Sequence, residues 1–141
     1  MSKWILSSDI EEWEKVDHEI EYELTVKGYS SKFIASIMLA MDEAFANISM
    51  YAYSNERGIV IIESSYEVKD NCRYAKISFI DYGIEFNPLE KETNPNIQET
   101  TASKRKIGGL GIFLIKKSVD EIRYTYSNCA NKLEFIKKEN I

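Results

Sequence analysis

The chain has 141 residues, of which 44% are hydrophobic and 29% charged, and its net charge is -5 at neutral pH. This length is typical of one domain, which buries enough apolar surface to fold without a disulfide or a structural metal. The acidic balance, with no basic stripe, argues against a nucleic-acid binder, although backbone N–H groups can still bind an anionic ligand.

The two cysteines and the N-terminal segment indicate where the protein works. Cys72 and Cys129 match neither a C-x-x-C pattern nor a zinc-binding spacing, which favours free thiols in a reducing compartment. The N-terminal segment turns acidic from Asp9 onward, unlike the apolar core of a signal peptide. Because no apolar run approaches the roughly 20 residues that span a bilayer, we expect a soluble cytoplasmic protein with no membrane contact.

The first half of the chain predicts one strand and two helices. Residues 3–7 form the strand, and a helix follows from about Asp9, with apolar residues at helical spacing. Gly28 suits the position that ends this helix. A second helix is expected from about Ser31 to Tyr53, followed by a turn.

The second half predicts four strands, one helix and a long polar loop. Two strands joined by a KDNC turn form an antiparallel hairpin, and a helix and two further strands close the chain. Their approximate ranges are 59–66, 73–80, 112–119, 122–126 and 132–136. Residues 88–107 contain two prolines and few apolar anchors, as in a lid or binding loop. The pattern predicts a single α+β domain over residues 1–141, a two-layer sandwich whose mixed, mostly antiparallel sheet carries helices on one face.

The second helix carries the first candidate site residues. Glu43 and Asn47 lie one turn apart on the side opposite a stripe that should face the sheet. That stripe comprises Ile34, Met41, Phe45, Ile48 and Ala52. A solvated face is the simplest interpretation of Glu43 and Asn47. However, Asp42 and Glu43 are the only charged residues in 33–55, so we expect this face to be covered, for example by a ligand under a lid.

A second candidate motif, beginning at Asp81, directly follows a predicted strand. Asp, Gly, Asn and Pro are all turn residues, so a plain turn is one interpretation. In the other, the Asp81 carboxylate accepts a hydrogen bond from the amine of adenine, and Gly83 lets the backbone approach the ring. The motif alone leaves both interpretations open.

The third motif is Gly-Gly-Leu-Gly at residues 108–111, between the polar loop and a helix. Glycines before a helix expose backbone N–H groups at the positive end of the helix dipole, which suits phosphate. Lys104 and Arg105 lie just upstream and could close over an anionic tail. A flexible hinge with a solvated charge run is the alternative, and the spacing of a Walker-type loop is absent.

Taken in order, the three motifs resemble the Bergerat ATP-binding fold of DNA gyrase, the large heat-shock chaperones, mismatch-repair ATPases and sensor histidine kinases. Within that fold the chain looks most like the stand-alone anti-sigma-factor serine kinases of bacteria. DEAFANISMYAY resembles their N-box, IDYGIEFNP their first glycine box, KIGGLGIFLIKKSVDEIRY their second, and SNCANKLEFIKK their final hairpin.

The resemblance implies a role for each matching residue. Glu43 corresponds to the general base, Asn47 to the magnesium ligand and Asp81 to the adenine-binding carboxylate. The remaining cofactor-binding positions are Gly83, which shapes the pocket, Gly109, Leu110 and Gly111 in the phosphate loop, and Lys104 and Arg105 in the lid. Tyr51 departs from the family, which often has histidine there.

The resemblance also implies a function. The chain would use ATP and Mg²⁺ to phosphorylate a serine or threonine of a small anti-anti-sigma protein, would bind a sigma factor, and would act as a homodimer. Two alternatives remain open, namely an ATP-binding switch without chemistry and a kinase in a pathway without a sigma factor. A sensor kinase carries its phosphorylated histidine in a separate helical domain, so we expect His18 to be an ordinary helix residue.

Overall fold

The structure is a computed structural model that describes residues 1–53, 56–90 and 110–141. The helical elements are α1 (Ile10–Val26), α2 (Ser31–Asn47), the π-helical turn η1 (Ile48–Ala52), the 3-10 turn η2 (Pro88–Glu90) and α4 (Leu110–Ser118). The strands are β1 (Ser2–Ser7), β2 (Ile59–Lys69), β3 (Cys72–Asp81), β4 (Glu121–Ser127) and β5 (Ala130–Asn140).

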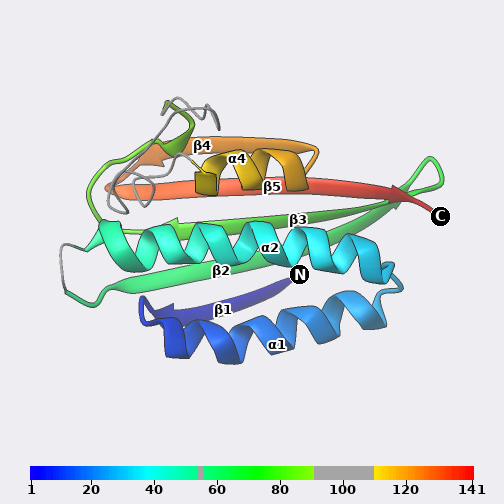
Figure 1. Ribbon diagram of the computed structural model, residues 1–141, viewed down its shortest axis with the longest axis horizontal. Coiled ribbons are helices and arrows are strands. Elements are labelled where there is room, and N and C mark those ends of the chain that lie inside the picture. Colours follow the sequence, from blue (N-terminus) through cyan, green and yellow to red (C-terminus); the bar gives the residue numbers. More distant parts are fainter. Residues whose placement is uncertain (54–55, 91–109) are drawn as a thin grey trace.

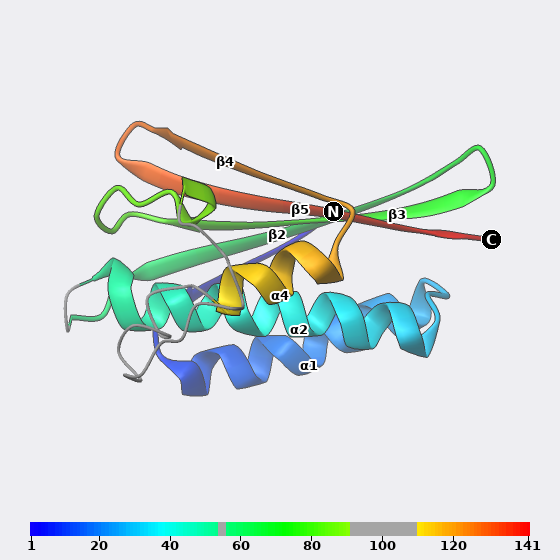
Figure 2. The same ribbon diagram turned by 45° about the horizontal axis from the view of Figure 1, so that its top comes forward.

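The five strands form one sheet in the order β1-β2-β3-β5-β4, and every described strand pair is antiparallel. α1, α2 and α4 lie side by side over one face of this sheet (Figure 1). The turned view shows them as one layer beside the sheet (Figure 2). The α+β two-layer sandwich predicted from the sequence is therefore confirmed, although its described strand pairs are all antiparallel and the sheet is not mixed.

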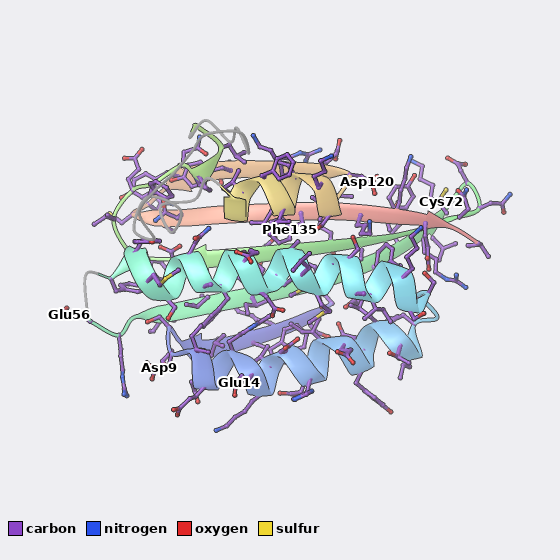
Figure 3. The ribbon with its side chains drawn as sticks, in the orientation of Figure 1. Asp9, Glu14, Glu56, Cys72, Asp120 and Phe135 are labelled. Carbon is purple, nitrogen blue, oxygen red and sulfur yellow. The ribbon has the colours of Figure 1, made fainter. Side chains whose placement is uncertain are left out.

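The core lies between the two layers. In β3, Ala75, Ile77 and Phe79 are buried, as the predicted alternation of that strand requires. Phe135 of β5 is fully buried on the face of the sheet that the helices cover (Figure 3). The buried residues of α1 repeat at helical spacing, and they are Trp13, Val16, Ile20 and Leu24.

The second predicted helix is divided into two parts. Ser30 caps α2, since its hydroxyl oxygen accepts a hydrogen bond from the N–H of Phe33 at 3.1 Å. The α-helix ends at Asn47, and η1 continues as a π-helical turn, a local widening that is frequent at functional sites. The sequence analysis did not predict this change of helix type.

By length and composition alone, the stretch Ser31–Ala52 could cross a membrane, which the sequence analysis did not anticipate. Its Ile37, Met41 and Phe45 are nevertheless fully buried in the core of the sandwich. An apolar helix that packs against a sheet needs this composition whether or not a membrane is present.

Candidate functional site

A pocket of about 270 Å³ lies where the C-terminal end of α2 and η1 face the end of β3 and the start of β5. Cys72, at the opposite end of β3, lies far from it (Figure 3). The polar residues of the wall are Asn47, Tyr51, Asp81, Tyr124 and Asn131. The rest of the wall is apolar, from Ala44 and Ile48 on the helix to Phe79 and Leu133 on the sheet. Such a pocket, mostly apolar with a few convergent polar groups, is typical of a small-molecule site.

Asp81 is the acidic residue of the pocket wall, and its side chain is only 6% exposed. Its Oδ1 accepts hydrogen bonds from the backbone N–H of Gly83 and from Nδ2 of Asn131, both at 3.0 Å. Burial raises the pKa of this carboxyl, and the two hydrogen bonds act in the opposite direction because they favour the charged form. Among the described residues, Oδ2 has no hydrogen-bond partner, so it is left for a ligand that donates a hydrogen bond.

Gly83 fits against η1 and does not line the pocket. A Cβ atom at this position would lie 2.1 Å from the backbone oxygen of Ala52. That distance is too short for any side chain, so only glycine fits there. The next N–H, of Ile84, donates a hydrogen bond to that same oxygen at 3.1 Å. The sequence analysis assigned Gly83 to a close approach to a bound ring, whereas the close approach in the structure is to Ala52.

At the start of α4, Gly111 lies beside the two site residues that were predicted on α2. A Cβ atom at Gly111 would lie 3.1 Å from Oε2 of Glu43 and 3.8 Å from Nδ2 of Asn47. Asn47 lines the pocket and Glu43, which is half-buried, lies beside it without lining it. The side chains of Glu43 and Asn47 therefore lie at the N-terminal, positive end of the α4 dipole, next to the pocket.

The face of α2 that the sequence analysis expected to be covered is covered in part by α4. α2 and α4 pack directly against each other, and the hydroxyl of Ser36 donates a hydrogen bond to the backbone oxygen of Ser118 at 3.1 Å. Protein packing, as well as any bound ligand, therefore explains why this face carries so few charged residues.

Several predicted site residues lie outside the described residues, namely Lys104, Arg105 and Gly109. The predicted lid at 88–107 lies outside them as well, except that Pro88–Glu90 form η2. Leu110 is the first residue of α4.

A metal would need ligands beyond the side chains around Asn47. Within 1–53, 56–90 and 110–141, no group of three or more His, Cys, Asp or Glu side chains could hold a metal ion. Mg²⁺ is commonly bound by one or two protein oxygens together with phosphate oxygens and water. The side chain of Asn47, whose amide lies near Gly111 at the start of α4, could supply one such oxygen.

Sequence analysis missed Asn131, a residue of the pocket wall. It is 6% exposed and lies directly opposite Asp81 in the register of β3 and β5. The sequence analysis placed it in the turn before the strand predicted at 132–136, where asparagine is common, so its residue type gave no signal. Its pairing with Asp81 could not be found without the register, because the two residues are far apart in the chain.

Comparison with known proteins identifies a domain family and several relatives. A model of the histidine kinase-like ATPase domain matches residues 6–137. The chain is 26% identical over 100 residues to serine-protein kinase RsbW of Listeria innocua, an alignment that covers 70% of this chain and 62% of the relative.

Two further relatives carry the same name. RsbW of Oceanobacillus iheyensis is 29% identical over 99 residues, or 68% of this chain and 60% of the relative. RsbW of Staphylococcus aureus strain MRSA252 is 26% identical over 110 residues, or 77% of this chain and 69% of the relative. The chain thus spans about three fifths of the length of the relatives it matches first.

Proposed function

We propose that this chain, which belongs to the histidine kinase-like ATPase domain family, binds ATP in its pocket and transfers the terminal phosphate to a serine or threonine of a partner protein. The observation that carries the proposal is the buried Asp81 carboxylate, which keeps one acceptor oxygen for a ligand in an otherwise apolar pocket. The serine-protein kinase names of the relatives support the transfer step.

The pocket suits adenine in both shape and polarity. A flat aromatic base can pack between the apolar residues of the helix side and those of the sheet side, while its amine donates to Asp81. Ile84 and Phe86 line the pocket yet are 60% and 36% exposed, so a bound base would cover apolar surface that is now in water. Covering such surface favours binding by about 25 cal/mol per Å².

The phosphate end would lie towards α4. Asn47 would supply an oxygen to a magnesium ion, whose charge offsets that of the phosphates. Glu43 would accept the proton of the attacking hydroxyl while the new O–P bond forms and the bond to the leaving ADP oxygen breaks. In this arrangement Gly111 leaves room for the Glu43 carboxylate, since a side chain there would press against it.

The partner and the setting belong to the same proposal. We propose a small anti-anti-sigma protein as the phosphate acceptor, a sigma factor as the second partner, and a homodimer that works in the cytoplasm. The support for these assignments is the resemblance to anti-sigma-factor serine kinases and the shared name of the relatives.

A paired measurement tests the proposal. Purified protein is incubated with labelled ATP, Mg²⁺ and candidate partners encoded next to its gene, and phosphate incorporation and ATP affinity are both measured. Glu43→Gln should leave ATP affinity largely intact while transfer falls about 10²–10⁴-fold, as expected for loss of a general base. Asn47→Ala should instead weaken the magnesium-dependent part of ATP binding.

Two results would change the proposed function or the role of Glu43. If the wild-type protein binds ATP and a partner but never phosphorylates that partner, the chain is an ATP-dependent switch. If Glu43→Gln transfers phosphate at the wild-type rate, Glu43 is not the base, whatever the fate of the kinase assignment.

A further inference from the structure

Asn131 occupies an unusual place for its residue type. It lies near the start of β5, a strand flanked by β3 and β4, and pairs with Asp81 on one side and Tyr126 on the other. Asparagine is depleted in strands, and a buried amide costs free energy unless its hydrogen bonds are satisfied. Asn131 is only 6% exposed, so its burial requires partners that satisfy its hydrogen bonds.

The amide uses its full hydrogen-bonding capacity. Nδ2 donates to Oδ1 of Asp81 at 3.0 Å and to the backbone oxygen of Ile84 at 2.9 Å. Oδ1 of Asn131 accepts from the N–H of Phe86 at 3.1 Å and from the hydroxyl of Tyr124. An amide turned the other way would set its oxygen against two acceptor oxygens, so the partners determine its orientation.

These bonds fix both the acceptor of the pocket and one of its walls. Because Asn131 and Gly83 both donate to Oδ1 of Asp81, the carboxylate cannot rotate without losing two hydrogen bonds. The same amide holds the backbone at Ile84 and Phe86, whose side chains line the pocket. Oδ2, as a carboxylate oxygen, can accept a hydrogen bond from the amine of a base, and it would repel a carbonyl oxygen at the same point.

We propose that Asn131 is the positioning residue that orients Asp81 for an amine-bearing nucleobase and ties the Ile84–Phe86 wall to it. This inference rests on the proposed nucleotide site and adds the residue that sets its preference for adenine over guanine. Asn131 acts through Asp81 and through the backbone of the wall, and it takes no part in the transfer step.

The test is nucleotide affinity across a range of pH. Asn131→Leu is similar in size and removes all four hydrogen bonds, and Asn140→Leu is the matched change at the exposed far end of the same strand. Calorimetric titrations of both variants and the wild type with ATP and with GTP are made between about pH 5 and 8. If Asn131→Leu fails to fold by circular dichroism, the smaller Asn131→Ala is judged by the same criteria.

Asn131→Leu should bind ATP about tenfold or more weakly at neutral pH and should lose part of the preference over GTP. Its affinity should also begin to fall at a higher pH than that of the wild type, because Asp81 has lost a donor that favours its charged form. Asn140→Leu should match the wild type throughout.

A loss of equal size at every pH, or no loss, would overturn the role of Asn131 while leaving the nucleotide site in place. A wild-type protein that binds neither nucleotide would refute the proposed function itself, and this inference with it.

Discussion

Two glycines beside the site are required for different steric reasons. At Gly83 an added Cβ would meet backbone, 2.1 Å from the oxygen of Ala52, and that backbone is held by η1. At Gly111 it would meet the end of a side chain, 3.1 Å from Oε2 of Glu43, which can move by a few tenths of an ångström. A substitution at Gly83 therefore damages the fold, whereas one at Gly111 displaces a proposed functional group.

Gly111→Ala should slow phosphate transfer without lowering the stability of the protein. Alanine is favoured over glycine in a helix by up to about 1 kcal/mol, so the free energy of unfolding should stay the same or rise. Phosphate transfer should fall about tenfold or more, since small displacements of a reacting group carry large rate penalties. Chemical denaturation and the phosphate incorporation assay measure the two effects.

Gly28→Ala is the matched control for this prediction. Gly28 has a φ of 92°, a conformation that alanine adopts only with strain, and it follows the C-terminal end of α1. This variant should lose stability and keep its transfer rate. Equal transfer rates in Gly111→Ala and the wild type would contradict the placement of Glu43 at the reacting hydroxyl.

At the scale of elements, the hairpin between β4 and β5 carries local strain. Asn128 and Cys129 in its two-residue turn have φ values of 51° and 62°. Asparagine tolerates this left-handed conformation, whereas for most other residues with a side chain it costs roughly 1–2 kcal/mol of conformational free energy. The equivalent turn between β2 and β3 uses Asp70 and Asn71, which suit the conformation better.

Cys129→Gly should therefore stabilise the protein by about 1 kcal/mol, after allowance for the greater chain entropy of glycine in the unfolded state. The measurement is the midpoint of thermal unfolding under reducing conditions. Cys129→Ala removes the same thiol but keeps a Cβ, so it should give no such gain. A gain of equal size in both variants would mean that the thiol, not the backbone, is unfavourable.

The contact between α1 and α2 contains a second destabilising feature. Burial, followed by the charge of Asp42, raises the pKa of Asp17 from 3.8 to about 6. Asp42 itself accepts a hydrogen bond from Nε1 of Trp13 at 2.8 Å. Because the folded protein holds the Asp17 proton more tightly than the unfolded chain, this group favours folding below about pH 4 and loses that contribution as the pH rises through about 6.

Asp17→Asn should thus raise the free energy of unfolding above about pH 6, by about 1 kcal/mol once solvent screening is allowed for, and the gain should vanish below about pH 4. Denaturant unfolding at several pH values measures it. Glu19→Gln, an exposed substitution on the same helix, is the matched control. A constant gain for Asp17→Asn at all pH values would contradict the ionisation account.

Sequence periodicity predicted most elements because their apolar faces are continuous, as in α1 and β3. It did not predict the π-helical turn η1, at whose end Ala52 lies against Gly83, a contact between segments that are far apart in the chain. Motif spacing placed Asn47 and Asp81, which the structure brings to one pocket. The partnership of Asp81 with Asn131 depends on sheet register, which pairs residues that are far apart in the chain.

At the scale of the whole molecule, the two layers meet at the pocket. The helix layer supplies Asn47 and, beside it, Glu43, whereas the sheet supplies Asp81 and Asn131. A ligand that bridges the layers should stabilise the folded state by mass action, because the unfolded chain has no such site. The proposed kinase activity and the proposed role of Asn131 both depend on nucleotide binding at this junction.

The most direct test is therefore a calorimetric titration of the wild-type protein and Asp81→Asn with a non-hydrolysable ATP analogue and Mg²⁺. The substitution keeps the size of the side chain but can replace an acceptor oxygen with a donor, which leaves the amine of adenine mismatched. We predict saturable binding to the wild type and an affinity about tenfold or more lower in Asp81→Asn, with both proteins folded. Equal affinity in the two proteins, or no binding to the wild type, would contradict the account.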